Sequence, residues 1–265
     1  MKKKKYLFLG VTLCAVFIVL LTAYMTTSYL IDIETADNII TIGNVEASID
    51  ESPFNSGTVY SGVAGTVIDK APKVQNTGKN DEYVFLTIKV PKKTATFLIE
   101  SGSDTGKKDS GTNPRLGQIF KVLTSGAGTS VGSGSSPIIS YNKYSGASSA
   151  GWFYIESSFI TDTVTTSGTG SGTISTNYDV YTFCYNKKLA PNEKTISLFD
   201  KIQLKSIIDT DVTGNLNVLV SAYAIQADNL NLSGTAATSG AAPAYLTEAQ
   251  MNELYNIVTN KKAGA

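Results

Sequence analysis

Apolar and polar residues alternate along much of the chain, in short runs that are typical of β-strands. Between residues 83 and 90, every second position is aliphatic, namely Val84, Leu86, Ile88 and Val90. This period of two, with aromatic residues among the intervening positions, predicts a strand with two unequal faces. Similar runs predict further strands at residues 39–49, 152–160, 178–185, 195–204 and 215–225.

Turn-forming residues separate these predicted strands. The run Asn76-Thr77-Gly78-Lys79-Asn80 precedes one strand, and Ala190-Pro191-Asn192-Glu193 precedes another. Many short strands with few helices predict an all-β fold. We expect an antiparallel, jelly-roll-like β-sandwich formed by residues 29–232.

Two tracts rich in glycine, serine and threonine interrupt the strand pattern. Residues 124–136 contain 11 such residues out of 13, and residues 165–176 contain 11 out of 12. Tracts with so little apolar surface do not offset the entropy of ordering, so both are expected to be loops. Residues 101–177 are therefore expected to be a loop-rich insertion. Phosphate binding is a weak alternative, because no Gly-Lys-Ser or Gly-Lys-Thr follows the glycines.

The period changes near the C-terminus. Thr247 and Gln250 have the spacing of a capping box, and apolar side chains follow at helical spacing, at Met251, Leu254, Tyr255 and Val258. Residues 233–265 are therefore expected to form a linker and a short amphipathic helix.

The N-terminus has the three parts of a secretory signal peptide. Four lysines at residues 2–5 precede an apolar run at 6–25, and small residues follow at 26–28. We expect cleavage between Ser28 and Tyr29. The apolar run is also long enough to span a bilayer as a helix, so a retained membrane anchor is the alternative. Lipid attachment at Cys14 is disfavoured, because Leu13 precedes it.

Composition argues against several classes of function. The chain contains no histidine, which excludes a Ser-His-Asp triad, a Cys-His pair and any imidazole-based zinc site. Residues 1–28 contain four lysines and no acidic residue, so the rest of the chain has 18 basic and 22 acidic residues, a formal charge of −4. Such a balance gives no attraction to nucleic acid. We expect no catalytic residue, no cofactor and no metal.

The single cysteine after residue 28 and two acidic pairs are interpreted as structural residues. Cys184 is the only cysteine after residue 28 and is expected to be a small buried hydrophobe in a strand. The acidic pairs Asp81-Glu82 and Asp209 with Asp211 are interpreted as solvated turn residues, with weak calcium binding as the alternative.

Four stretches together resemble the TasA/camelysin family of exported proteins from Gram-positive bacteria. They are YLIDIETADNIITIGNV at residues 29–45, KVQNTGKNDEYV at 73–84, LAPNEKT at 189–195 followed by Leu198-Phe199-Asp200, and SAYAIQAD at 221–228. The stretches occur in the order seen in that family and extend over most of the chain after the signal. The glycine-rich tracts are not part of the shared pattern.

The resemblance implies a jelly roll that is secreted to the cell surface or biofilm matrix, and processing by a SipW-type signal peptidase. Members of that family join into fibres when each subunit donates its N-terminal strand to a neighbour. The residues expected to enter the neighbouring copy are Ile39, Ile40, Ile42, Val45, Ala47 and Ile49. The expected partners are thus the chain itself and other matrix or surface proteins.

Several alternatives remain open from the sequence. The sequence favours neither pairing of the N-terminal strand within its own domain nor its donation to another copy. Some family members have been described as metal-dependent peptidases, but the absence of histidine disfavours that activity here. A membrane-anchored adhesin or binding module is a third reading, supported by the apolar run at residues 6–25.

Overall fold

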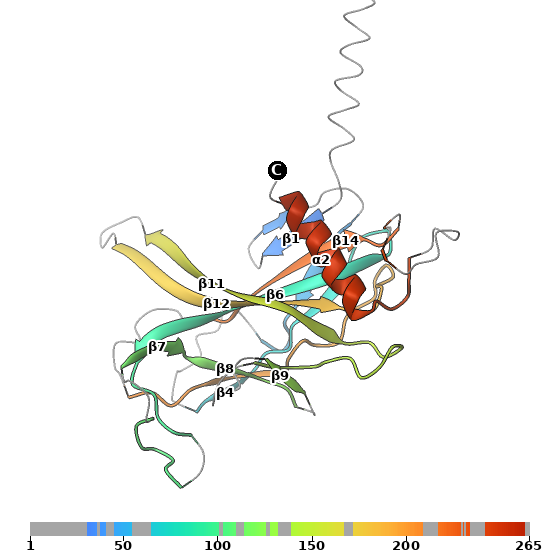
Figure 1. Cartoon of the computed structure of the whole chain (residues 1–265). Coiled ribbons are helices and arrows are strands. Elements are labelled where there is room, and N and C mark those ends of the chain that lie inside the picture. The colour runs from blue at the N-terminus through green and yellow to red at the C-terminus, as the bar shows by residue number, and fades with distance from the viewer. Residues whose placement is uncertain are drawn as a thin grey trace, which may run out of the picture.

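The fold is all-β, with one helix near the C-terminus of the part that the structure describes. The computed structural model describes residues 31–35, 38–40, 45–54, 65–100, 103–109, 114–125, 128–131, 139–166, 172–208, 217–228, 230, 232–233 and 242–262. Two main layers of strands face one another, and the helix lies on the outside of one of them (Figure 1).

The larger layer, which we call the main sheet, has seven strands. Its order is β11 (Trp152–Thr166), β12 (Gly172–Tyr185), β6 (Glu82–Ala95), β14 (Leu219–Gln226), β1 (Ile31–Thr35) and β2 (Asn38–Ile40), with β7 (Arg115–Gln118) paired to the far end of β6. All of these pairs are antiparallel. The N-terminal strand therefore lies beside the last strand of the described chain.

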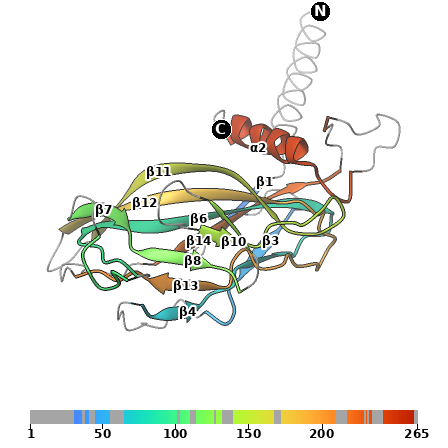
Figure 2. The same cartoon turned by 60° about the horizontal axis from the view of Figure 1, so that its bottom comes forward.

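The second sheet has five strands and lies under the main sheet, as Figure 2 also shows. Its order is β4 (Val67–Asp69), β13 (Lys201–Leu204), β8 (Phe120–Leu123), β10 (Ile139–Tyr141) and β9 (Thr129–Val131). The pairing of β8 with β10 is parallel, which departs from the purely antiparallel sheets predicted. A separate two-stranded sheet joins β3 (Ala47–Asp50) to β5 (Lys73–Asn76).

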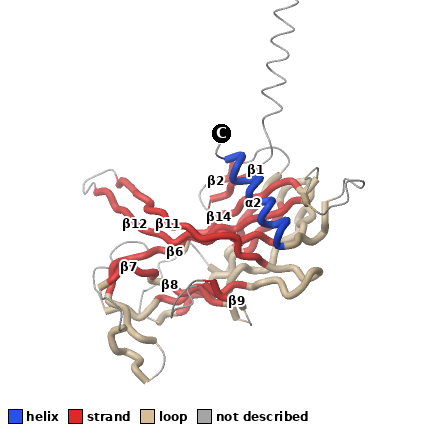
Figure 3. Tube along the Cα trace, viewed as in Figure 1, coloured by secondary structure: helices blue, strands red, loops and turns tan. Residues whose placement is uncertain are grey.

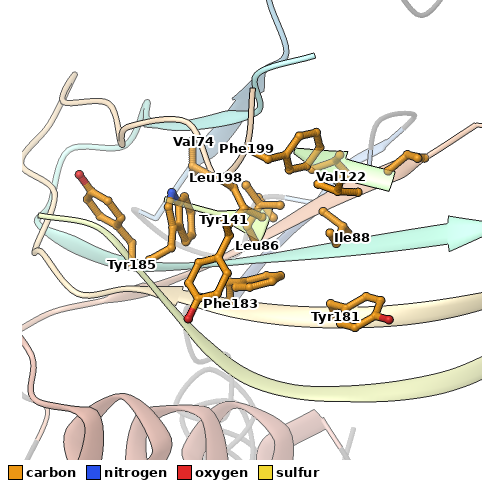
Figure 4. Close-up of a cluster of buried hydrophobic side chains, with 14 of the residues drawn as sticks. Val74, Leu86, Ile88, Val122, Tyr141, Tyr181, Phe183, Tyr185, Leu198 and Phe199 are labelled. Atoms are coloured by element: carbon orange, nitrogen blue, oxygen red, sulfur yellow. The ribbon is translucent and has the colours of Figure 1, made fainter. Parts of the chain in front are cut away.

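The core lies between the two main layers. Side chains of β6, β12 and β14 point towards those of β8, β10 and β13, and the labelled residues of Figure 4 belong to this cluster. Val84, Leu86, Ile88 and Val90 are all fully buried in it. The alternation read from the sequence between residues 83 and 90 therefore predicts this face of β6 correctly.

The opposite face of β6 is buried as well, because α2 (Glu248–Lys262) covers it. Met251 and Leu254 are fully buried against Tyr83 and Phe85. The predicted capping box is confirmed, since Gln250 N donates to Thr247 Oγ1 (3.3 Å) and Thr247 N donates to Gln250 Oε1 (2.9 Å). Burial of each large apolar side chain stabilises the packing by about 1.5–3 kcal/mol.

The prediction of one strand over residues 39–49 is wrong. Residues 39–40 belong to β2 and residues 47–49 to β3, and these two strands pair in different sheets. The prediction at residues 195–204 is correct only from Lys201. Before it, the main chain makes single bonds to several segments and no continuous ladder: Thr195 N donates to Val74 O, Leu198 N donates to Pro72 O, and Asn142 N donates to Leu198 O.

The segment expected to be a loop-rich insertion supplies strands. Residues 101–177 include β7, β8, β9, β10 and all of β11. Residues 165–166 and 172–176, predicted to be loop, are in β11 and β12, where Thr165 pairs with Thr173 and Val164 pairs with Ile174. β-branched side chains suit a pleated sheet, and this preference outweighs the effect of the surrounding glycines. Figure 3 shows the long hairpin and the strand-rich lower layer in red.

Candidate functional site

Three of the four sequence stretches singled out above meet at one end of the sandwich, in a corner built around Asn76, and Glu46, which directly follows the other stretch, contacts the same corner. Asn76 ends β5 and is fully buried. Its side-chain Nδ2 donates to Asn80 O (2.8 Å) and to Leu189 O (3.1 Å), while Oδ1 accepts a bond from Gly78 N (2.9 Å). An asparagine that bonds its own main chain two residues ahead stabilises a tight turn. Asn76 thus fixes the turn and ties it to a distant loop.

The segment that precedes β3 is bonded to the same turn. Glu46 O accepts hydrogen bonds from Thr77 N (2.7 Å), Gly78 N (2.9 Å) and Thr77 Oγ1 (3.1 Å). Val45, beside Glu46, is fully buried in the main core. The chain is therefore anchored at Val45 and Glu46.

The loop from residue 189 to 195 closes the corner from the other side. Leu189 and Glu82 exchange both main-chain hydrogen bonds, at 2.9 and 3.0 Å. Asn192 N donates to Asn76 O (2.8 Å), and Asn192 has a φ of 67°, a region that asparagine tolerates better than most residues. Thr195 Oγ1 then accepts a bond from Val74 N (2.9 Å). These contacts are structural, since each one satisfies a main-chain group.

The fourth stretch reaches the corner through β14. Ala227 N donates to Asp81 O (2.8 Å), just beyond the last register pair between β14 and β6. The Asp81 carboxylate pairs with Lys188 at 2.6 Å, and Glu82 is fully buried at the start of β6. The interpretation of Asp81-Glu82 as solvated turn residues is therefore wrong. Asp209 and Asp211 lie outside the described residues.

The residues predicted to donate a strand divide into two groups. Ile39 and Ile40 lie in β2, which pairs with β1 at the rim of the main sheet. Val45 and Ala47 are buried in the core, and Ile49 packs against it from β3. Ile42, like the predicted cleavage residues Ser28 and Tyr29, lies outside the described residues. All described members of the set pair or pack within their own chain.

β1 is one of several strands that the sequence patterns did not single out, and the one that bears on strand exchange. It pairs with β14 over five positions, from Ile31 opposite Ile225 to Thr35 opposite Ser221. The sequence signal was present, because Ile31 and Ile33 alternate with Asp32 and Glu34. A strand of this kind completes the edge of β14 with main-chain hydrogen bonds.

Two reactive side chains, those of Cys184 and Lys70, are shielded from solvent. Cys184 is fully buried in β12, as predicted, and burial raises its pKa. Burial also lowers the pKa of Lys70, which is 2% exposed, although Glu51 lies 2.6 Å from its ammonium. The Phe54 ring lies 3.9 Å from the same ammonium. Within the described residues, no three Asp, Glu, Cys or His side chains are grouped closely enough to hold a metal ion.

A hollow of about 260 Å³ opens beside β8, lined in part by Leu98, Glu100, Lys121, Gln203 and Ser206. Glu100 pairs with Lys121 and accepts a hydrogen bond from Ser206 N (2.6 Å). Burial acts to raise the pKa of Glu100, but these hydrogen bonds outweigh it and lower the pKa. The ion pair holds the loop after β6 against β8.

The described part of the chain has no helix with the length and apolar character needed to cross a membrane. The apolar run at residues 6–25 lies outside that part. No protein-family model, curated protein or solved structure matches the chain. The resemblance to the TasA/camelysin family therefore stays a prediction.

Proposed function

We propose that the chain is a secreted structural subunit of the cell surface or biofilm matrix. In this proposal the sandwich is a jelly roll, and copies join into fibres by exchanging their N-terminal strand. A SipW-type signal peptidase would release the strand by cutting between Ser28 and Tyr29, and other matrix proteins are further partners. The observation that carries the proposal is the position of β1, at the rim of the main sheet and close behind that predicted cut.

The geometry of the rim supports strand exchange. β2 pairs with β1 and with no other described strand, so β1 makes the ladder that joins this hairpin to β14. When β1 leaves, five residues of β14 expose main-chain donors and acceptors to solvent. The same segment of a neighbouring copy satisfies them equally well, which is how an added strand binds a sheet edge.

The buried anchor sets the length of the exchanged segment. Val45 is fully buried, and Glu46 O accepts three hydrogen bonds from the Asn76 turn. Removing residues from Val45 onwards would open the core, whereas residues 29–43 end before it. The exchanged segment is therefore residues 29–43, which include Ile39, Ile40 and Ile42.

A pair of cysteines distinguishes exchange from pairing within one chain. Thr35 and Ser221 lie directly opposite each other in the register of β1 and β14. Because Cβ atoms of such cross-strand pairs are typically about 4.5–5.5 Å apart, a small adjustment lets cysteines at both positions form a disulfide. We expect Thr35→Cys with Ser221→Cys, oxidised after assembly, to give a ladder of covalently linked chains on a denaturing gel without reductant. Each single variant is the control and gives no ladder.

Pairing within one chain would instead give a disulfide-bonded monomer, which would exclude strand exchange. Deleting residues 29–43 provides the second test. Fibres seen by electron microscopy should disappear, while the near-ultraviolet signal of the buried Trp152 remains. If fibres persist after the deletion, strand exchange is the wrong mechanism.

A further inference from the structure

The hairpin of β11 and β12 extends beyond the rest of the main sheet. β12 pairs with β6 from Cys184 back to Asn177, which lies opposite Lys92. Before Asn177, β12 pairs only with β11 among the described strands. Residues 161–166 and 172–176, which we call the arm, therefore form a two-stranded ribbon. Figures 1 and 3 show it leaving the body while β6 turns away towards β7.

A ribbon of two strands is marginally stable in water, and each of its edges has unpaired main-chain groups. Natural sheets protect such edges with lysine, proline or other charged residues. The arm contains no Lys, Arg or Pro, and Asp162 is its only charged residue. Eight of its 11 residues are β-branched, namely Thr161, Thr163, Val164, Thr165, Thr166, Thr173, Ile174 and Thr176. Such residues favour sheet pairing.

The two edges of the arm differ in charge. The edge strand β11 contains the acidic residues Glu156 and Asp162, and Tyr255 of α2 hydrogen-bonds to Glu156. A second β11 beside it would bring acidic residues together, which destabilises a sheet. The edge of β12 from Gly172 to Thr176 has no charge at all. Two copies of this edge approach each other without repulsion.

We propose that the arm is a contact site for a second copy of this chain, in which the two β12 edges pair antiparallel about a two-fold axis. An identical, uncharged edge is the partner that such a symmetric contact requires. A register centred on Ile174 places that residue opposite its own counterpart, with Thr173 opposite Ser175. The four strands of the two arms then form one sheet.

This contact is separate from the exchange of β1, which takes place at the opposite edge of the main sheet. It buries far less than the roughly 1,200 Å² of a standard stable interface, so it is weak for a single pair of copies. Copies that are already joined in a fibre present many arms at once, and multivalency strengthens the contact. The arm would thus join fibres side by side.

Single cysteines in the arm test the proposal. Ile174 and Val164 lie opposite each other within one arm, so they stand at the same distance from its tip. In the proposed sheet the two copies of residue 174 are neighbours, whereas the two copies of residue 164 are three strand spacings apart, roughly 14 Å. We expect Ile174→Cys to form a disulfide-linked dimer under mild oxidation and Val164→Cys to form none. Both are made with Cys14→Ser in the full chain, and Cys184 is buried.

The outcomes separate this contact from strand exchange. A dimer that forms with Ile174→Cys and persists after deletion of residues 29–43 supports the arm contact alone. Equal cross-linking at both positions indicates random collision and overturns the proposal. So does the absence of a dimer in a chain whose Trp152 fluorescence is unchanged. Mixing Thr173→Cys with Ser175→Cys chains checks the register, because only the mixture should link efficiently.

Discussion

The side-chain amide of Asn76 donates a hydrogen bond to the main-chain carbonyl of Leu189, 113 positions later in the chain, at an N···O distance of 3.1 Å. The bond joins the turn before β6 to the loop after β12, next to the two main-chain bonds between Glu82 and Leu189. The corner is thus held by one side chain whose donors and acceptor all have partners inside the protein. A buried group with this many partners is costly to remove.

Asn76→Ala should lower the free energy of unfolding by about 3 kcal/mol, because it removes three hydrogen bonds of a fully buried side chain, each of which contributes about 1 kcal/mol. Urea denaturation, followed by the fluorescence of the single tryptophan, measures the change. Asn192→Gly in the same corner is the control. Its positive φ suits glycine, so it should change stability by less than about 1 kcal/mol. Equal effects of the two variants would contradict the role given to Asn76.

Gly151→Ala should be strongly destabilising, although the change adds only a methyl group. A Cβ at Gly151 would lie 2.4 Å from Tyr144 N and 2.5 Å from Tyr144 Cα, and these main-chain atoms cannot rotate away. We expect a loss of about 2 kcal/mol. Gly146, in the same loop, has no atom within 4 Å of the corresponding position. Gly146→Ala should therefore be almost neutral in the same denaturation experiment.

Leu254→Ala should loosen α2 from the main sheet. The side chain is fully buried between the helix and β6, so its loss costs about 3 kcal/mol. Asn256→Ala, on the exposed side of the same helix, is the matched control. Limited proteolysis measures the effect, and cleavage within residues 242–262 should be faster in the first variant only. Equal cleavage rates would mean that the helix does not depend on this contact.

Stability should fall in alkaline solution, partly because of Tyr181. Burial raises its pKa to about 12, although a hydrogen bond with Gln118 acts in the opposite direction. The ordinary pKa is 10.0, so the folded chain holds the phenol proton more tightly than the unfolded chain. The resulting stabilisation is complete below pH 10 and is lost as the pH rises towards 12.

Tyr181→Phe should therefore flatten the dependence of unfolding free energy on pH between 10 and 12. Urea denaturation at several pH values in that range provides the measurement. At neutral pH the variant should lose about 1 kcal/mol, the value of one hydrogen bond, since Gln118 Nε2 keeps its bond to Asp179. An unchanged slope would mean that Tyr181 does not contribute to the alkaline loss.

Local patterns predicted the elements whose signal lies within a few residues. The alternation of β6 and the capping box at Thr247 are examples, because strand faces and helix ends are set by neighbouring side chains. The sequence patterns did not predict that α2 covers Tyr83 and Phe85. The two apolar faces of β6 show that both are buried, but they do not identify which element packs on each face. The loop prediction was wrong at residues 165–166 and 172–176, because their composition gives no sign that β11 and β12 pair there.

Pairing partners are the part that the sequence did not specify. The Asn76 turn and the loop at residues 189–195 are both visible as turn chemistry, but the bond between them depends on the register of the intervening strands. The separation of residues 39–49 into two sheets has the same origin. Each half has a strand pattern, and the turn at Thr77 and Gly78 decides where the second half is held.

The pairing of β1 with β14 can form only late in the synthesis of the chain. A chain is synthesised from its N-terminus, so β1 exists long before its partner, which is the last strand of the described part. Until β14 is made, β2 is the only described strand that can pair with β1 as it does in the folded chain. If copies exchange β1 as proposed, the crowding of newly made chains should favour pairing of β14 with the β1 of another molecule over pairing with its own.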